Sequence, residues 1–114
     1  MGYPLVQITN STNYIASGTV HLASIFCSND DYTVTPNTTW TESSRGVCLV
    51  TEISATLQTT SGNIVATPYT SSGTSYSQFA VIQTSPTTFE VTRRVSGTED
   101  TVPADHIEPT EHQK

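Results

Sequence analysis

Basic side chains are scarce in this sequence, which has only four lysine and arginine residues among 114. Proteins that bind nucleic acids neutralise phosphates with lysine and arginine, and the same residues draw proteins to anionic lipid. The scarcity therefore argues against a nucleic-acid-binding protein and against a polybasic membrane anchor. We expect no nucleic acid among the partners of this protein.

Long apolar runs are also missing. A helix that spans a bilayer needs about 20 consecutive apolar residues, and no run in the sequence approaches that length. The N-terminal stretch, MGYPLVQITN, lacks the basic and apolar regions of a signal peptide. We predict no transmembrane segment, and a protein that is either cytoplasmic or exported without a leader.

The patterns that accompany common catalytic sites are absent as well. The sequence contains no G-x-S-x-G nucleophile elbow, no H-E-x-x-H zinc motif and no glycine-rich phosphate loop. Its two cysteines fit no zinc pattern, because a structural zinc site would need two more ligands nearby. We predict that the protein is not an enzyme and uses no metal or cofactor.

Hydroxyl side chains take the place of charge. The chain holds 22 threonines and 14 serines, while only 12% of its residues are charged. Threonine is β-branched and suits a half-exposed strand, whereas disordered chains are usually rich in charge and poor in β-branched residues. The composition indicates a folded all-β protein.

Alternation of apolar and polar residues predicts strands throughout the chain. Val6 and Ile8 share one face of the first strand, and the segment 47–59 alternates most regularly. Gly18, inside a long predicted strand, indicates a bulge or a bend. The predicted strands are 3–9, 14–27, 32–34, 38–41, 47–59, 64–67, 76–84 and 88–95. About seven to nine short strands separated by turn residues favour a two-sheet antiparallel β-sandwich.

The composition changes after residue 95. The segment 96–114 has no aromatic residue and holds five of the ten acidic residues. We predict a β-sandwich domain over 1–95 and a polar, acidic C-terminal extension over 96–114.

The segment from Cys27 to Cys48 is the most unusual part of the chain, because it holds both cysteines and the only tryptophan. Two interpretations remain open. The cysteines form a disulfide that closes a loop of about 20 residues and stabilises the fold by roughly 3 kcal/mol, or they are two buried free thiols.

Side chains suited to ligand binding gather in the same segment. Trp40 and Tyr32 are candidate stacking platforms for a sugar ring or a lipid headgroup, with a core position for Trp40 as the alternative. Asp30 and Asp31 offer carboxylates to a ligand, or they belong to a turn capped by its own side chains. Arg45 offers a planar fork to an anionic group, or it forms a surface ion pair.

A second candidate region lies between Tyr69 and Tyr76. These tyrosines bracket a predicted loop, 71–75, that is rich in serine, threonine and glycine. Such a surface suits adaptable hydrogen bonding. A solvated hairpin end is the alternative interpretation.

The first half of the chain has an order of short motifs and strands that is found in other proteins. A V-x-I-x-N-x-T stretch from Val6, a long strand, a V-x-P-x-x-x-W stretch from Val34 and a strong strand follow in order. This outline resembles small β-sandwich proteins such as the aegerolysins. The resemblance implies a lipid- or sugar-binding sandwich, and it assigns no individual residue.

Together these features predict a non-catalytic recognition module of lectin or cytolysin type, in which loops of the sandwich bind a glycan or a lipid headgroup. The alternative is a structural protein that assembles into homo-oligomers or filaments. Edge strands with few charges pair readily with other strands, and the C-terminal extension would then serve as a clasp between subunits.

Overall fold

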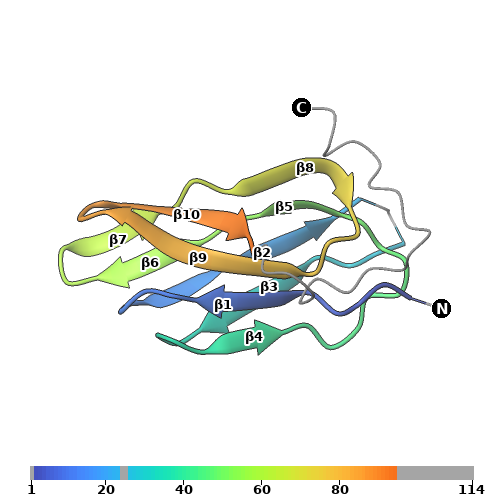
Figure 1. Ribbon diagram of the computed structural model, residues 1–114, viewed down its shortest axis with the longest axis horizontal. Helices are drawn as coiled ribbons and strands as arrows, with labels where there is room; N and C mark the ends of the chain where they lie inside the picture. Colours follow the sequence, from blue (N-terminus) through green and yellow to red (C-terminus); the bar gives the residue numbers. More distant parts are fainter. Residues whose placement is uncertain (1, 24–25, 95–114) are drawn as a thin grey trace.

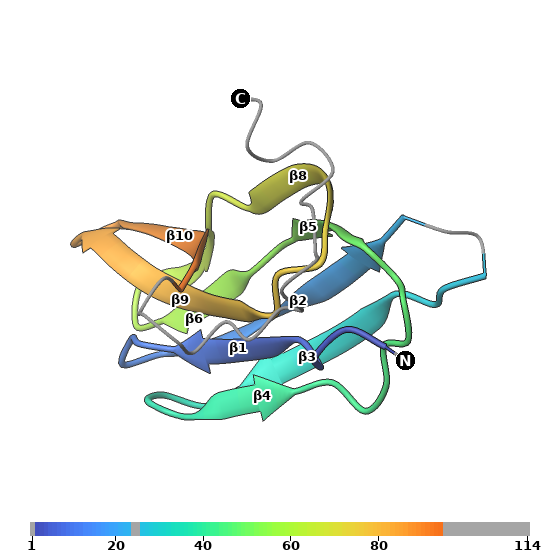
Figure 2. The same ribbon diagram turned by 45° about the vertical axis from the view of Figure 1, so that its right-hand side comes forward.

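The computed structural model describes residues 2–23 and 26–94. These residues form strands in two layers that pack face to face (Figures 1 and 2). The strands are β1 (Gln7–Asn10), β2 (Ile15–Leu22), β3 (Asp30–Val34), β4 (Thr39–Thr41), β5 (Val50–Ile53), β6 (Thr56–Thr59), β7 (Gly62–Val65), β8 (Tyr69–Thr74), β9 (Gln78–Ser85) and β10 (Thr88–Arg93). The predicted all-β fold is confirmed.

The first sheet has the strand order β10-β9-β1-β4. In the second sheet the order is β7-β6-β2-β5-β8, and β3 also pairs with β2. Strand β1 runs parallel to β9, whereas the other pairs of named strands are antiparallel. The sandwich is therefore mostly antiparallel, with one parallel pair that the sequence pattern did not predict. Within the described ranges there is no helix that could cross a membrane.

The prediction of one continuous strand over 47–59 is wrong, because the structure divides this segment into β5 and β6 at Ser54 and Ala55. A Cβ atom on Gly18 of β2 would collide with the Ser54 carbonyl group, so the two backbones lie in close contact there. The Ser54 amide donates to the Thr19 carbonyl oxygen at 3.1 Å, and Ser54 Oγ accepts from the Thr19 amide at 3.1 Å. The interruption adds one strand to those predicted, and the close contact explains the glycine.

The predicted loop 71–75 is also wrong, because most of it belongs to β8. Strand β8 pairs with β5, and the register shifts beside the pair Val50 and Thr74. At this bulge Ser71 Oγ donates to the Val50 carbonyl oxygen at 2.7 Å, and Gly73 has a φ of 135°. The serine and glycine residues that predicted a loop therefore build a bulge inside a strand.

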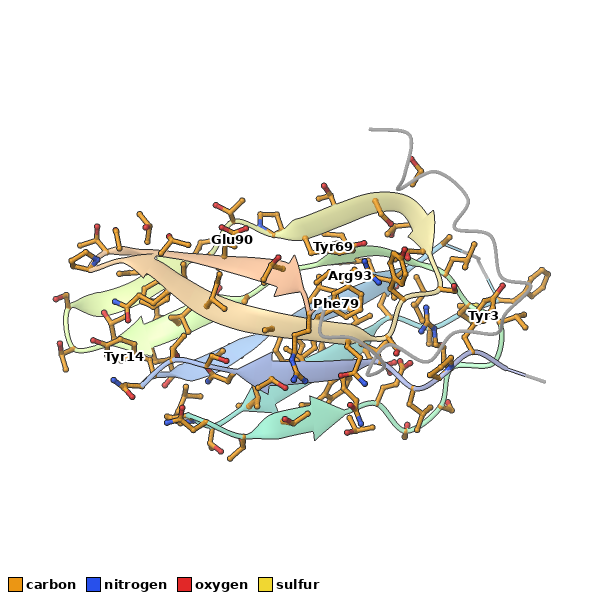
Figure 3. All side chains as sticks on the ribbon, in the orientation of Figure 1. Tyr3, Tyr14, Tyr69, Phe79, Glu90 and Arg93 are labelled. Atoms are coloured by element: carbon orange, nitrogen blue, oxygen red, sulfur yellow. A yellow bond between two sulfur atoms is a disulfide. The ribbon has the colours of Figure 1, made fainter. Side chains whose placement is uncertain are left out.

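The core lies between the two sheets. Val6 and Ile8 are both buried, so the alternation predicted for the first strand is confirmed. Aromatic pairs extend along the core, with the Tyr69 and Phe79 rings 4.8 Å apart near its middle (Figure 3). Burial of such a side chain stabilises a fold by about 1.5–3 kcal/mol.

The two ends of the sandwich differ (Figure 1). We call the left-hand end the turn end, because the short connections 11–14, 35–38, 60–61 and 86–87 lie there. We call the other end the loop end, and it comprises residues 2–6, 26–29, 42–49 and 75–77. Figure 3 shows Tyr14 near the turn end and Tyr3 at the loop end. The predicted boundary at residue 95 and the extension 96–114 lie outside the described residues.

Candidate ligand-binding site at the loop end

A disulfide joins Cys27 and Cys48, whose Cα atoms are 6.1 Å apart. Cys27 follows β2 and Cys48 precedes β5, so the bond links two connections that enter and leave the second sheet. Of the two interpretations of this cysteine pair, the disulfide is the one confirmed. The bond holds the β2–β3 and β4–β5 connections in one arrangement.

Arg45 is buried and donates to backbone carbonyl groups of several segments. Its Nε donates to the Cys48 oxygen and its Nη1 to the Pro4 oxygen, each at 2.9 Å. Nη1 also donates to the Tyr76 oxygen at 3.1 Å, and Nη2 donates to the Thr74 oxygen at 2.9 Å. Arg45 therefore ties the N-terminal segment and the β8–β9 connection to the disulfide, which is a structural task that neither interpretation of this residue anticipated.

A pocket of about 350 Å³ lies beside the disulfide. Its wall combines apolar, hydroxyl and charged side chains, among them Leu22, Phe26, Ser28, Ser44, Asp30 and Arg45. This volume is at the lower end of the range for small-molecule pockets. The pocket suits a ligand group of modest size that forms polar contacts.

Two large apolar side chains next to the disulfide are exposed to solvent. Phe26 is 91% exposed and Val47 is 67% exposed. Each directly precedes a cysteine of the disulfide, so both are held near the same cross-link. Exposed apolar side chains gathered in one place are typical of a surface that contacts a partner or a membrane.

The predicted stacking platforms lie mainly in the core. Tyr32 is only 3% exposed, its hydroxyl donates to the Ser54 carbonyl oxygen at 2.6 Å, and burial raises its pKa. Trp40 is half-buried, with its ring centroid 5.5 Å from that of Tyr32. Tyr32 therefore offers no ring face to a ligand, and Trp40 packs against the core as its alternative interpretation held.

Asp30 and Asp31 point to opposite faces of β3. Asp31 is exposed and accepts a hydrogen bond from Thr19 Oγ1 at 2.8 Å. Asp30 is half-buried and lines the pocket. The two carboxylates are therefore not brought together, and the described part of the chain has no group of three potential metal ligands. Only Asp30 remains in the candidate site.

Tyr69 and Tyr76 do not form a loop surface. Tyr69 is half-buried on β8 against Phe79. Tyr76 is buried, and the Arg93 guanidinium group lies 3.2 Å from its ring centroid. Both tyrosines therefore pack within the structure, so we leave them out of the candidate site.

Glu42 was missed by the sequence analysis and is fully buried, with 1% of its surface exposed. Its Oε1 accepts from the Val6 amide at 2.9 Å, and its own amide donates to the Val6 carbonyl oxygen at 3.0 Å. Burial and the neighbouring Asp30 raise its pKa to about 7, although the Val6 amide and Arg45 act in the opposite direction. The signal in the sequence was its position two residues after Trp40, on the same face of the extended chain.

The structure thus brings Phe26, Asp30, Arg45 and Val47 to the loop end, together with the disulfide. Comparison with known proteins adds no further assignment, because no family model, curated protein or solved structure matches this chain.

Proposed function

We propose that this protein is a non-catalytic recognition module that binds a lipid headgroup or a glycan at the loop end. The observation that carries the proposal is the polar pocket next to exposed Phe26 and Val47, on connections joined by a disulfide. The pocket would hold the polar part of the ligand, and the two apolar side chains would contact its apolar surroundings.

Charge and rigidity support this proposal. Asp30 and Arg45, of opposite sign, both line the pocket, so a neutral or zwitterionic group fits better than a strongly anionic one. The disulfide and the hydrogen bonds of Arg45 hold the pocket wall in place before a ligand arrives. Such preorganisation lowers the entropy that is lost on binding.

The test is co-sedimentation with phosphatidylcholine vesicles, with and without a panel of competing sugars. We expect the protein to pellet with vesicles, and we expect Phe26→Ser combined with Val47→Ser to weaken the partition by roughly tenfold or more, because burial of a phenylalanine contributes about 1.5–3 kcal/mol. Sugars that release the protein would identify a glycan as the ligand.

The matched control is Val65→Ser. Val65 on β7 is 75% exposed but belongs to the strand that leads away from the turn end. We expect this variant to bind vesicles as the wild type does. Equal losses in both variants, or no binding to vesicles or sugars by the wild type, would remove the loop end as the site.

The alternative, homomeric assembly, is favoured by the edge of the second sheet. Strands β7 and β8 lie at its ends, and residues 53–89 carry no charged side chain. Uncharged edges are poorly protected against pairing with a second chain. Sedimentation velocity tests this: we expect Val65→Lys to dissociate any oligomer, and a wild type that is monomeric at all concentrations rules assembly out.

A further inference from the structure

Strands β3 and β4 bring two carboxyl groups together between the sheets. The two strands are joined by the short turn 35–38 but belong to different sheets. Their side chains meet at Tyr32 and Trp40, whose ring centroids are 5.5 Å apart. Alternate residues of an extended chain share a face, so Asp30 and Glu42 form the next facing pair toward the loop end.

The environment of Glu42 is unusual for a carboxylate. Oε1 accepts from the Val6 amide, but Oε2 is buried and has no hydrogen-bond partner among the described residues. A buried polar atom without a partner is costly. The carboxyl group of Asp30 is within hydrogen-bonding reach, yet two ionised carboxylates are both acceptors and cannot bond to each other.

We infer that Asp30 and Glu42 share one proton, and that its release loosens the loop end. With the proton on Glu42, Oε2 donates a hydrogen bond to the Asp30 carboxylate, so this buried oxygen gains a partner. Without the proton, two negative charges lie side by side in a region of low dielectric constant. Their repulsion separates the start of β3 from the segment after β4. The disulfide joins that segment to the connection before β3, and residues of both line the pocket.

A proton explains the pair better than a metal ion. Calcium takes six to eight oxygen ligands, whereas the described residues offer no group of three potential metal-binding side chains. The charged groups that act on Glu42 are Asp30 from β3 and Arg45 from the loop after β4, and the N-terminal segment contributes the Val6 backbone amide. The positive charge of Arg45 disfavours a second cation at this place.

The sign of the pH dependence follows from the direction of the shift. The pKa of Glu42 is raised from 4.5 to about 7 in the folded protein. The folded state therefore holds the proton more tightly than the unfolded state between these values. The stabilisation is complete below pH 4.5, is lost as the pH rises toward 7, and changes little at higher pH. This inference does not depend on the proposed ligand.

The decisive variant is Glu42→Gln, because glutamine keeps the acceptor for Val6 and presents an amide donor to Asp30. We would follow the Glu42 side-chain carboxyl carbon by NMR, together with the backbone amides of 26–30 and 42–48. In the wild type we expect one transition near pH 7 at all of these positions. In Glu42→Gln we expect no such transition in the amides, and the ratio of the unfolding constants of the two proteins to change about tenfold or more between pH 5 and 8.

Two further variants serve as controls. Asp31→Asn removes the neighbouring carboxylate on the exposed face of β3, and we expect it to leave the transition unchanged. Asp30→Asn removes the partner, and we expect it to move the Glu42 transition to lower pH. If Glu42→Gln does not fold, the titration of Asp30→Asn decides the question.

Three results would overturn the inference. The first is a Glu42 carboxyl group that titrates near its ordinary value in the wild type. The second is an amide transition that persists in Glu42→Gln, or a Glu42 transition that does not move in Asp30→Asn. The third is stabilisation by millimolar calcium chloride with loss of the transition, which would replace the shared proton with a cation site.

Discussion

The turn end and the loop end of this sandwich are stabilised in different ways. At the turn end the buried Asn10 side chain donates to the Tyr14 and Val34 carbonyl oxygens at 2.7 and 3.0 Å, and its Oδ1 accepts from the amide and hydroxyl of Thr12. At the loop end a disulfide and the Arg45 guanidinium group connect segments far apart in the sequence.

The difference follows from the lengths of the connections. A turn of a few residues loses little conformational entropy on closure, so hydrogen bonds from one side chain suffice to order it. The longer segments of the loop end lose more conformational entropy on folding. They are held by the disulfide and by the buried guanidinium group of Arg45. Binding residues are commonly displayed on loops that a rigid scaffold positions, and the loop end meets that description.

The largest expected effect is that of Arg45→Met. Four backbone carbonyl groups lose their donor, and we expect the free energy of unfolding to fall by about 4 kcal/mol. Urea unfolding measures the change. As a control, Arg94→Met removes a half-buried arginine that donates to Gln78 at 3.2 Å, and a fall of about 1 kcal/mol is expected. Equal losses in the two variants would mean that Arg45 does not hold the loop end together.

The next effect is that of Cys27→Ser combined with Cys48→Ser. We expect the free energy of unfolding to fall by about 3 kcal/mol, because the unfolded chain gains conformational entropy when the loop is no longer closed. Amide hydrogen exchange should accelerate in 26–29 and 42–49 and stay unchanged in 11–14. Faster exchange at both ends would show that the two ends do not unfold separately.

Asn10→Ala tests the turn end. The substitution removes the donor of two carbonyl groups and the acceptor of Thr12. We expect the free energy of unfolding to fall by about 2 kcal/mol. Ser11→Ala, at the exposed neighbouring position, should stay within about 0.5 kcal/mol of the wild type. Urea unfolding compares the two variants, and a similar loss in both would assign the effect to the turn as a whole rather than to Asn10.

The smallest expected effect is the coupling between the ends. When Asn10→Ala is combined with the two cysteine substitutions, the losses should add within about 0.5 kcal/mol, because distant sites act independently. A double-mutant cycle in urea measures this. A larger coupling energy would show that the stability of one end depends on the other through the strands between them.

Much of the fold could be predicted from local patterns. Threonine-rich alternation predicts strands, and the faces of Val6 and Ile8 follow from their spacing. Gly18 indicated a bend, but the sequence did not reveal that Ser54 lies against it. The continuity of 47–59 therefore failed, since the interruption depends on a contact between segments far apart in the chain.

The candidate site was less predictable. Residue type showed that Tyr32 could stack on a ligand and that Arg45 could bind an anionic group. Whether such a side chain faces a ligand or the interior depends on tertiary packing, and both are buried. The exposure of Phe26 and Val47 could not be predicted either, because large apolar residues are usually expected inside. The approach of Glu42 to Asp30 requires β3 and β4 to lie in opposite sheets.

The parallel pairing of β1 with β9 has a consequence for how the chain is made. Gln7 of β1 pairs with Gln78 of β9, so the first strand of the sandwich to be made pairs with one of the last strands of the described region. Contacts so distant in sequence form late and slow folding. The six strands of the second sheet, β2, β3, β5, β6, β7 and β8, all precede β9 in the chain. During synthesis they can therefore assemble while β1 still lacks one of its two neighbours. The emerging chain therefore passes through a stage in which one sheet is complete and the face that it will bury is still open to water.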